Sequence, residues 1–178
     1  MVITDVGPRD GLQNQPRILS VQQRQQLIKA LRGAGLGSIE VGSFVSPKAV
    51  PAMAGTDTLM AALPLGDGVH YTALIPNLKG YELAREAGAR SVTMVLYASD
   101  EMARKNANMT MAQAESSAAD ILTRARADSI EVIATMSVAF ACPFAGDTDP
   151  AIVVEAADKF FKLGADKVVI ADTIGAAN

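Results

Sequence analysis

The stretch Gly35-Leu36-Gly37-Ser38-Ile39-Glu40-Val41 decides the fold, because its glycines end a helical pattern and an apolar, strand-like run follows at once. The same form returns at residues 87–93 and 163–169. Such βα units at a spacing of roughly thirty residues predict a parallel sheet with right-handed crossovers. Strands are predicted over residues 2–6, 38–42, 70–75, 91–97, 129–138 and 167–171, and helices over 21–33, 49–63, 78–88, 111–127 and 150–164.

Several residue types mark the helix ends in this pattern. Ser20 and Thr110 are predicted N-caps, because a hydroxyl can accept a hydrogen bond from the first helical turn. Gly33, Gly88 and Gly164 stand where C-terminal stops belong, since glycine adopts the left-handed conformation without strain. These residues therefore predict where the helices begin and end.

Two architectures fit the alternation: an open doubly wound sheet and part of an eight-stranded barrel. A dinucleotide site needs its glycines between a strand and the next helix, whereas the glycines of residues 33–37 follow a helix and precede a strand. Polar residues instead follow several different strands, as in barrel enzymes. We therefore expect one domain, residues 1–178, with a parallel (β/α) TIM-barrel fold holding about six of the eight units.

The composition narrows the functional classes. Apolar residues make up 49% of the 178 residues and aromatic residues 4%, which suits an aliphatic core between helices and a parallel sheet. A net charge of −3 with no basic run argues against a nucleic-acid partner. No apolar run approaches the ~20 residues that span a bilayer, so no membrane association is expected. One cysteine and no room for a leader before Val2 favour a cytoplasmic protein.

Charged residues lie at or near the ends of predicted strands. Burying a charge there costs free energy unless the charge is paired or has a functional role. Arg9 and Asp10 follow the first strand, Glu40 lies within the second, and Asp172 follows the last. From the residues alone, Asp10 could cap the next turn, pair with Arg9 or bind a metal. Arg9 could equally form a structural ion pair with Glu40 or Asp172.

The string Val6-Gly7-Pro8-Arg9-Asp10-Gly11-Leu12-Gln13-Asn14 resembles the opening motif of the hydroxymethylglutaryl-CoA lyase family. Similar motifs follow in order at residues 40–53, 75–80, 105–106, 142–143 and 172–175, so the resemblance covers the whole chain. It implies a TIM barrel that cleaves a 3-hydroxyacyl-CoA to acetyl-CoA and a keto acid by a metal-assisted retro-Claisen reaction, as in leucine degradation. It also implies a divalent cation, Mg²⁺ or Mn²⁺, and leaves homo-oligomer formation open.

The resemblance assigns roles to four charged residues. Asp10 is the expected metal ligand, and Arg9 is expected to stabilise the enolate that forms from the thioester. Glu40 is expected to orient Arg9 and the metal site, and Asp172 to support the site or handle a proton. For Glu40 and Asp172, a charge that only balances Arg9 stays an alternative.

Three further residues are expected on the substrate side: Gln13, Asn77 and Lys79. Lys79 could meet a CoA phosphate or could equally be a solvated lysine of the first helical turn. His70 stands at the start of a strand, the face of a barrel that serves stability. Cys142 is expected to be a packed or loop thiol.

The chain also departs from the family pattern. Gln15 and Pro16 stand where the family has an acidic and a basic residue, Ile133 and Thr135 replace Arg and Tyr, and Tyr97 replaces a small residue. These changes predict a different acyl pocket.

The family's His-x-His metal pair has no counterpart here, since the chain contains one histidine. We therefore expect the N-terminal part of a longer lyase, without activity as these 178 residues alone. The alternatives are a related lyase or acetyl-transferring enzyme for another acyl-CoA, and a non-catalytic half-barrel interaction module.

Overall fold

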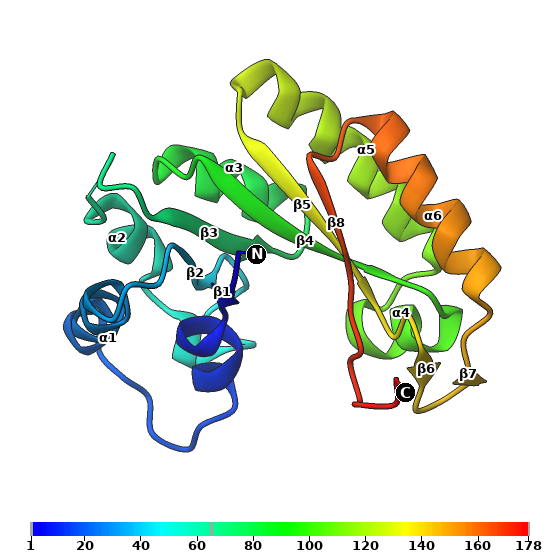
Figure 1. Cartoon of the computed structure of the whole chain (residues 1–178), viewed down its shortest axis with the longest axis horizontal. Coiled ribbons are helices and arrows are strands. Elements are labelled where there is room, and N and C mark those ends of the chain that lie inside the picture. Colours follow the sequence, from blue (N-terminus) through cyan, green and yellow to red (C-terminus); the bar gives the residue numbers. More distant parts are fainter. Residues whose placement is uncertain (1, 65, 178) are drawn as a thin grey trace. The chain divides into compact units, whose positions relative to one another are not determined.

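The computed structural model describes residues 2–64 and 66–177, and the chain divides into two compact units, residues 1–92 and 93–178 (Figure 1). Strands and helices alternate in both units, which confirms the α/β class. None of the helices in the described ranges has the length and apolar character that a membrane crossing needs.

The first unit is built on three parallel strands. β1 pairs with β2 from Thr4 opposite Ser38, and β2 pairs with β3 from Ser38 opposite His70. Every residue of β2 is buried, as expected for a strand covered on both faces. The elements are β1 (Thr4–Asp5), α1 (Val21–Gly33), β2 (Ser38–Ser43), a 3₁₀ turn (Pro51–Met53), α2 (Thr56–Ala61), β3 (His70–Ile75) and α3 (Leu78–Glu86).

The second unit repeats the pattern. β5 pairs in parallel with β8, from Ile133 opposite Lys167 to Met136 opposite Ile170. Figure 1 shows α5 and α6 side by side along these strands. The elements are β4 (Ser91–Tyr97), α4 (Asp100–Ala107), α5 (Met111–Asp128), β5 (Glu131–Ser137), the antiparallel hairpin of β6 (Ala141–Cys142) and β7 (Gly146–Asp147), α6 (Pro150–Leu163) and β8 (Lys167–Ile170).

The core of each unit is aliphatic, as the composition predicts. Buried side chains of the first unit come from strands and helices alike: Ile28, Ile39, Val41, Met53, Leu59, Ile75 and Tyr81. Those of the second unit are Ile121, Leu122, Val132, Ala134, Met136, Val138 and Phe160. Both layers therefore contribute to one hydrophobic interior in each unit.

Most of the predicted helix ends are confirmed. Ser20 and Thr110 accept from the backbone of Gln23 and Gln113, whose side chains bond back to complete capping boxes. Gly88 and Gly164 take left-handed conformations directly after their helices.

The helix α1 ends at Gly33 as predicted, and the left-handed residue follows at Gly35, which has a φ of +88°. Other predicted boundaries are wrong. The helix over 49–63 is two pieces, because Gly55 has a φ of +73° and interrupts it. The strand over 129–138 is shorter, because Ser129 and Val138 at its two ends have φ values of +56° and +55°.

Candidate active site at the first strand ends

A π-helical turn over Gly7–Gly11 places Arg9 and Asp10 directly after β1. The Val6 carbonyl accepts from Arg9 N at 3.1 Å and from Asp10 N at 2.7 Å, so both residues are fixed to the strand end. Gly7 N donates to Asp5 Oδ1 at 2.9 Å, which ties the start of the turn to β1. Turns of this kind are frequent at functional sites.

Arg9 lies between two carboxylates. Its Nε donates to Glu40 Oε1, and its Nη1 donates to Asp10 Oδ1 at 2.6 Å. The Glu40 side chain is 4% exposed and the Arg9 side chain 17%, whereas the Asp10 side chain is 55% exposed. The structure therefore brings three of the predicted site residues together, with a buried pair on one side and a solvent-facing carboxylate on the other.

The remaining predicted residues of the first unit are arranged less specifically. Gln13 is half-buried in the helical turn after Gly11. Asn77 is the N-cap of α3, and its Oδ1 accepts from Gly80 N at 3.0 Å. Lys79 is 71% exposed and lies 3.6 Å from Glu82 Oε2, which is the geometry of a surface pair. His70 bonds Ser38 Oγ through Nδ1 at 3.3 Å, consistent with its expected structural role.

Asp172 lies in the second unit and caps its own turn. Its oxygens accept from Ala176 N at 2.8 Å and Ala177 N at 3.1 Å. These backbone donors lower the pKa of the Asp172 carboxyl. The carboxylate is exposed, so the expected supporting or proton-handling role stays a prediction.

The sequence gives no sign of a strained residue at the end of β5. Val138 is fully buried with a φ of +55°, which is unfavourable for a β-branched residue. Thr173 Oγ1 accepts from Val138 N at 2.7 Å, and Thr148 donates to the Val138 carbonyl at 2.7 Å. The motif that contains Asp172 and Thr173 therefore helps to hold this strand end.

Cys142 is buried, as expected for a packed thiol. Burial acts to raise the pKa of the thiol, but hydrogen bonds from Ser99 and from the backbone of Phe144 and Ala145 outweigh it, so the pKa is lowered.

The metal site predicted at Asp10 is not complete in this chain's described residues. Within residues 2–64 and 66–177, no three His, Cys, Asp or Glu side chains lie close enough to bind one metal ion. Asp10 is the only proposed ligand, and Arg9 already donates to its carboxylate. Since Mg²⁺ and Mn²⁺ need several oxygen ligands, these residues do not fit a whole site.

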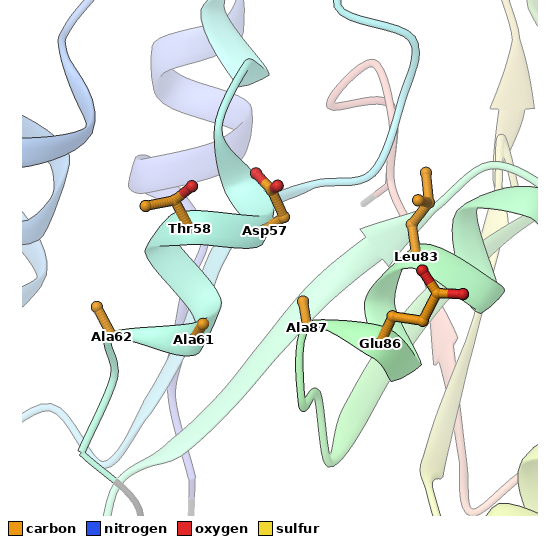
Figure 2. A pocket seen from close by; sticks show the side chains of 7 residues that line it. All are labelled: Asp57, Thr58, Ala61, Ala62, Leu83, Glu86 and Ala87. Atoms are coloured by element: carbon orange, nitrogen blue, oxygen red, sulfur yellow. The ribbon is translucent and has the colours of Figure 1, made fainter.

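A cavity of about 550 Å³ lies on the helical layer between α2 and α3 (Figure 2). Figure 2 shows the Asp57 carboxylate on α2 and the Glu86 carboxylate on α3, with Ala61 and Ala87 between them. None of the described residues that line it is basic, so it is a poor match for the phosphates of a CoA ester.

Parallel strands that alternate with helices, with charged side chains directly after a strand, are typical of the (β/α) barrel class. The HMGL-like family model matches residues 1–178, and the chain belongs to this family. It is 43% identical to the hydroxymethylglutaryl-CoA lyase of Pseudomonas mevalonii over 98% of this chain and 58% of that protein. It is 40% identical to the (R)-citramalyl-CoA lyase of Chloroflexus aurantiacus over 99% of this chain and 59% of that protein.

A solved structure confirms the fold class. An HMG-CoA lyase from Acenitobacter baumannii, in complex with coenzyme A and 3-methylmalate, superposes with a TM-score of 0.94 and is 35% identical. The match covers 99% of this chain and 58% of that one. The chain thus spans less than three fifths of the length of these relatives.

Proposed function

We propose that these residues form part of a carbon–carbon lyase that cleaves a 3-hydroxyacyl-CoA to acetyl-CoA and a keto acid. The observation that carries the proposal is Arg9, held by Glu40 and Asp10 at the end of β1. The two lyases and the coenzyme A complex among the relatives support a thioester as the substrate.

In a retro-Claisen cleavage, a base removes the proton of the C3 hydroxyl and the C2–C3 bond breaks. The electron pair of that bond moves into the thioester as an enolate, which is then protonated at C2. Arg9 is our proposed group for the enolate oxygen, because a fixed planar cation with little exposure stabilises a developing oxyanion strongly.

The proposed role of Glu40 in this step is to hold Arg9 in place. Its Oε1 accepts from Arg9 Nε and its side chain is almost fully buried, so it orients the guanidinium and balances its charge. Asp172 is our proposed proton-handling residue, and Asp10 our proposed metal ligand in a set that the described residues do not complete.

On the substrate side we propose Gln13, Asn77 and Lys79. The Asn77 amide nitrogen remains a donor while its oxygen caps α3, and the exposed Lys79 ammonium suits a CoA phosphate.

The acyl group of the proposed substrate is either 3-hydroxy-3-methylglutaryl or another 3-hydroxyacyl group, since lyases for both kinds of thioester are about equally similar to this chain. We also propose a cytoplasmic location, because a single cysteine suits a reducing compartment.

Acetyl-CoA release tests the proposal. The protein encoded by the complete reading frame around these residues, whatever its length, is incubated with Mg²⁺ or Mn²⁺ and with hydroxymethylglutaryl-CoA, citramalyl-CoA or a longer 3-alkyl analogue. We expect cleavage of at least one thioester, and a loss of about 100- to 1,000-fold in kcat for Arg9→Met. Arg32→Met is the matched control, because Arg32 on α1 pairs with Asp67, which lies before β3.

Two results would count against the lyase. One is a folded protein that cleaves none of these thioesters, which favours a binding module. The other is full activity in Arg9→Met.

A further inference from the structure

Arg24 on α1 is a fully buried arginine whose observed acceptors are all neutral. Its Nη1 donates to the Ala54 carbonyl at 3.0 Å, and its Nη2 donates to Thr56 Oγ1 at 3.1 Å and to the Val41 carbonyl at 3.4 Å. Within residues 2–64 and 66–177, its Nε has no hydrogen-bond partner. The side chain is therefore a buried cation held by backbone carbonyls and a hydroxyl.

Such an arrangement is expensive. A buried cation without a carboxylate loses its hydration, and this desolvation lowers the pKa of Arg24. A well-packed apolar side chain of similar volume at the same place is often neutral or stabilising. The stability of the helical layer alone therefore does not explain an arginine at this position.

The donors hold an irregularity of β2. Glu40 lies opposite Thr72 of β3, but the next register pair is Ser43 opposite Leu74, so β2 has one residue more than β3 between these pairs. This is a β-bulge, which leaves backbone groups outside the ladder and re-aims the neighbouring side chains. Arg24 bonds the carbonyl of Val41, which lies within the bulge and directly after Glu40.

The same guanidinium ties the bulge to the start of α2. Thr56 accepts from Arg24 and donates to the Met53 carbonyl at 2.8 Å. Gly42 leaves the space for this, because a Cβ on it would lie 2.6 Å from Arg24 Nη2 and 2.7 Å from Thr56 Oγ1. The bulge, the segment before α2 and Arg24 thus form one connected network.

We propose that Arg24 is a positioning residue of the candidate active site: it holds the β2 bulge and so keeps Glu40 where it orients Arg9. If the bulge relaxed to regular pairing, residues on one side of it would turn to the opposite face of the sheet. Arg24 would then act on the site through the backbone of Val41, without touching substrate. The inference rests on the proposed function only in calling this site an active site.

The test reads the Arg9–Glu40 bond directly. In ¹⁵N-labelled protein, the Arg9 Nε–H signal is assigned by its absence in Arg9→Lys, and its hydrogen-exchange rate is measured. We expect Arg24→Met to raise this rate about tenfold or more, the equivalent of one net hydrogen bond. Arg24→Lys should restore a slower rate, because an ammonium keeps the charge and can reach some of the same acceptors.

Arg32→Met on the same helix is the control and should leave the Arg9 signal unchanged, since Arg32 bonds Asp67 at the surface. A folded Arg24→Met protein with an unchanged Arg9 Nε–H rate would overturn the inference. If Arg24→Met does not fold, Gly42→Ala takes its place, because the added Cβ would lie 2.6 Å from Arg24 Nη2 and 2.7 Å from Thr56 Oγ1 and so disturbs the same network. An unchanged rate in that variant would overturn the inference equally.

The lyase proposal and this inference fail separately. A protein that cleaves no thioester, yet speeds Arg9 exchange in Arg24→Met, refutes the lyase and leaves the positioning role standing. An active lyase with an unaffected Arg9 signal refutes the positioning role alone.

Discussion

Glu40→Gln is the sharpest perturbation of the site, because it removes one charge and little volume. The variant leaves Arg9 beside a neutral amide in a position where the native side chain is 4% exposed. Asp10 still accepts from Arg9 Nη1, but its side chain is 55% exposed and screened by water. Most of the compensation for the Arg9 charge therefore comes from Glu40.

The expected loss follows from this burial. Breaking a buried ion pair from one side costs about 3–5 kcal/mol, and a neutral acceptor that keeps one hydrogen bond returns part of it. Since Arg9 keeps 17% exposure, we expect the free energy of unfolding to fall by about 2–3 kcal/mol. With an m-value of about 2 kcal/mol per molar urea, the midpoint should shift by about 1–1.5 M.

Urea unfolding followed by far-UV circular dichroism measures this shift. The control is Asp158→Asn, which breaks an exposed i,i+4 pair with Lys162 and should leave the midpoint in place. The double variant Arg9→Met/Glu40→Leu should be more stable than Glu40→Gln, because it removes both charges. A midpoint in Glu40→Gln equal to that of the wild type would refute a desolvated Arg9–Glu40 pair.

The other predictions concern helix ends and a turn. Ser129→Gly should stabilise the protein by about 0.5–1 kcal/mol in thermal unfolding, because the end of α5 has a φ of +56°, whereas Ser129→Ala should give no gain. Ser20→Ala should cost about 1 kcal/mol through the loss of its capping box, and an unchanged melting temperature would contradict this. The lowered pKa of Asp172 means that its support of the last turn is complete above its ordinary value of 3.8 and is lost as the pH falls through the lower folded value. The amide shifts of Ala176 and Ala177 should report that titration, and an equal titration of both amides in Asp172→Asn would argue against it.

Local chemistry explains why much of the fold could be predicted. Ser20 and Thr110 each precede a glutamine by three residues, so the capping boxes follow from the sequence alone. The strand over 70–75 coincides with β3 because its apolar run is bounded by polar and turn residues. The positions of Arg9 and Glu40, at a strand end and among apolar residues, likewise indicate a site, since a buried charge is costly unless it is paired or functional.

The errors come from backbone conformations that side-chain patterns do not encode. The helix over 49–63 reads as continuous in composition, but Gly55 adopts a positive φ and starts α2 late. No sequence pattern predicts the left-handed conformation of Val138. This conformation is held by hydrogen bonds to Thr148 and Thr173, which belong to other segments of the chain. No local pattern indicates the burial of Arg24, since its acceptors belong to residues 17 to 32 positions away.

β2 is the element on which Arg9 and Arg24 both act. Arg9 bonds the Glu40 side chain, and Arg24 bonds the carbonyl of the next residue, Val41. A strand buried at every position gives these two contacts a rigid support, which a site needs if its groups are to keep their geometry. The two arginines differ in what balances them, carboxylates for Arg9 and neutral oxygens for Arg24. Loss of Glu40 should therefore unbalance a charge at the site, whereas loss of Arg24 should remove a charge and loosen the backbone that carries Glu40.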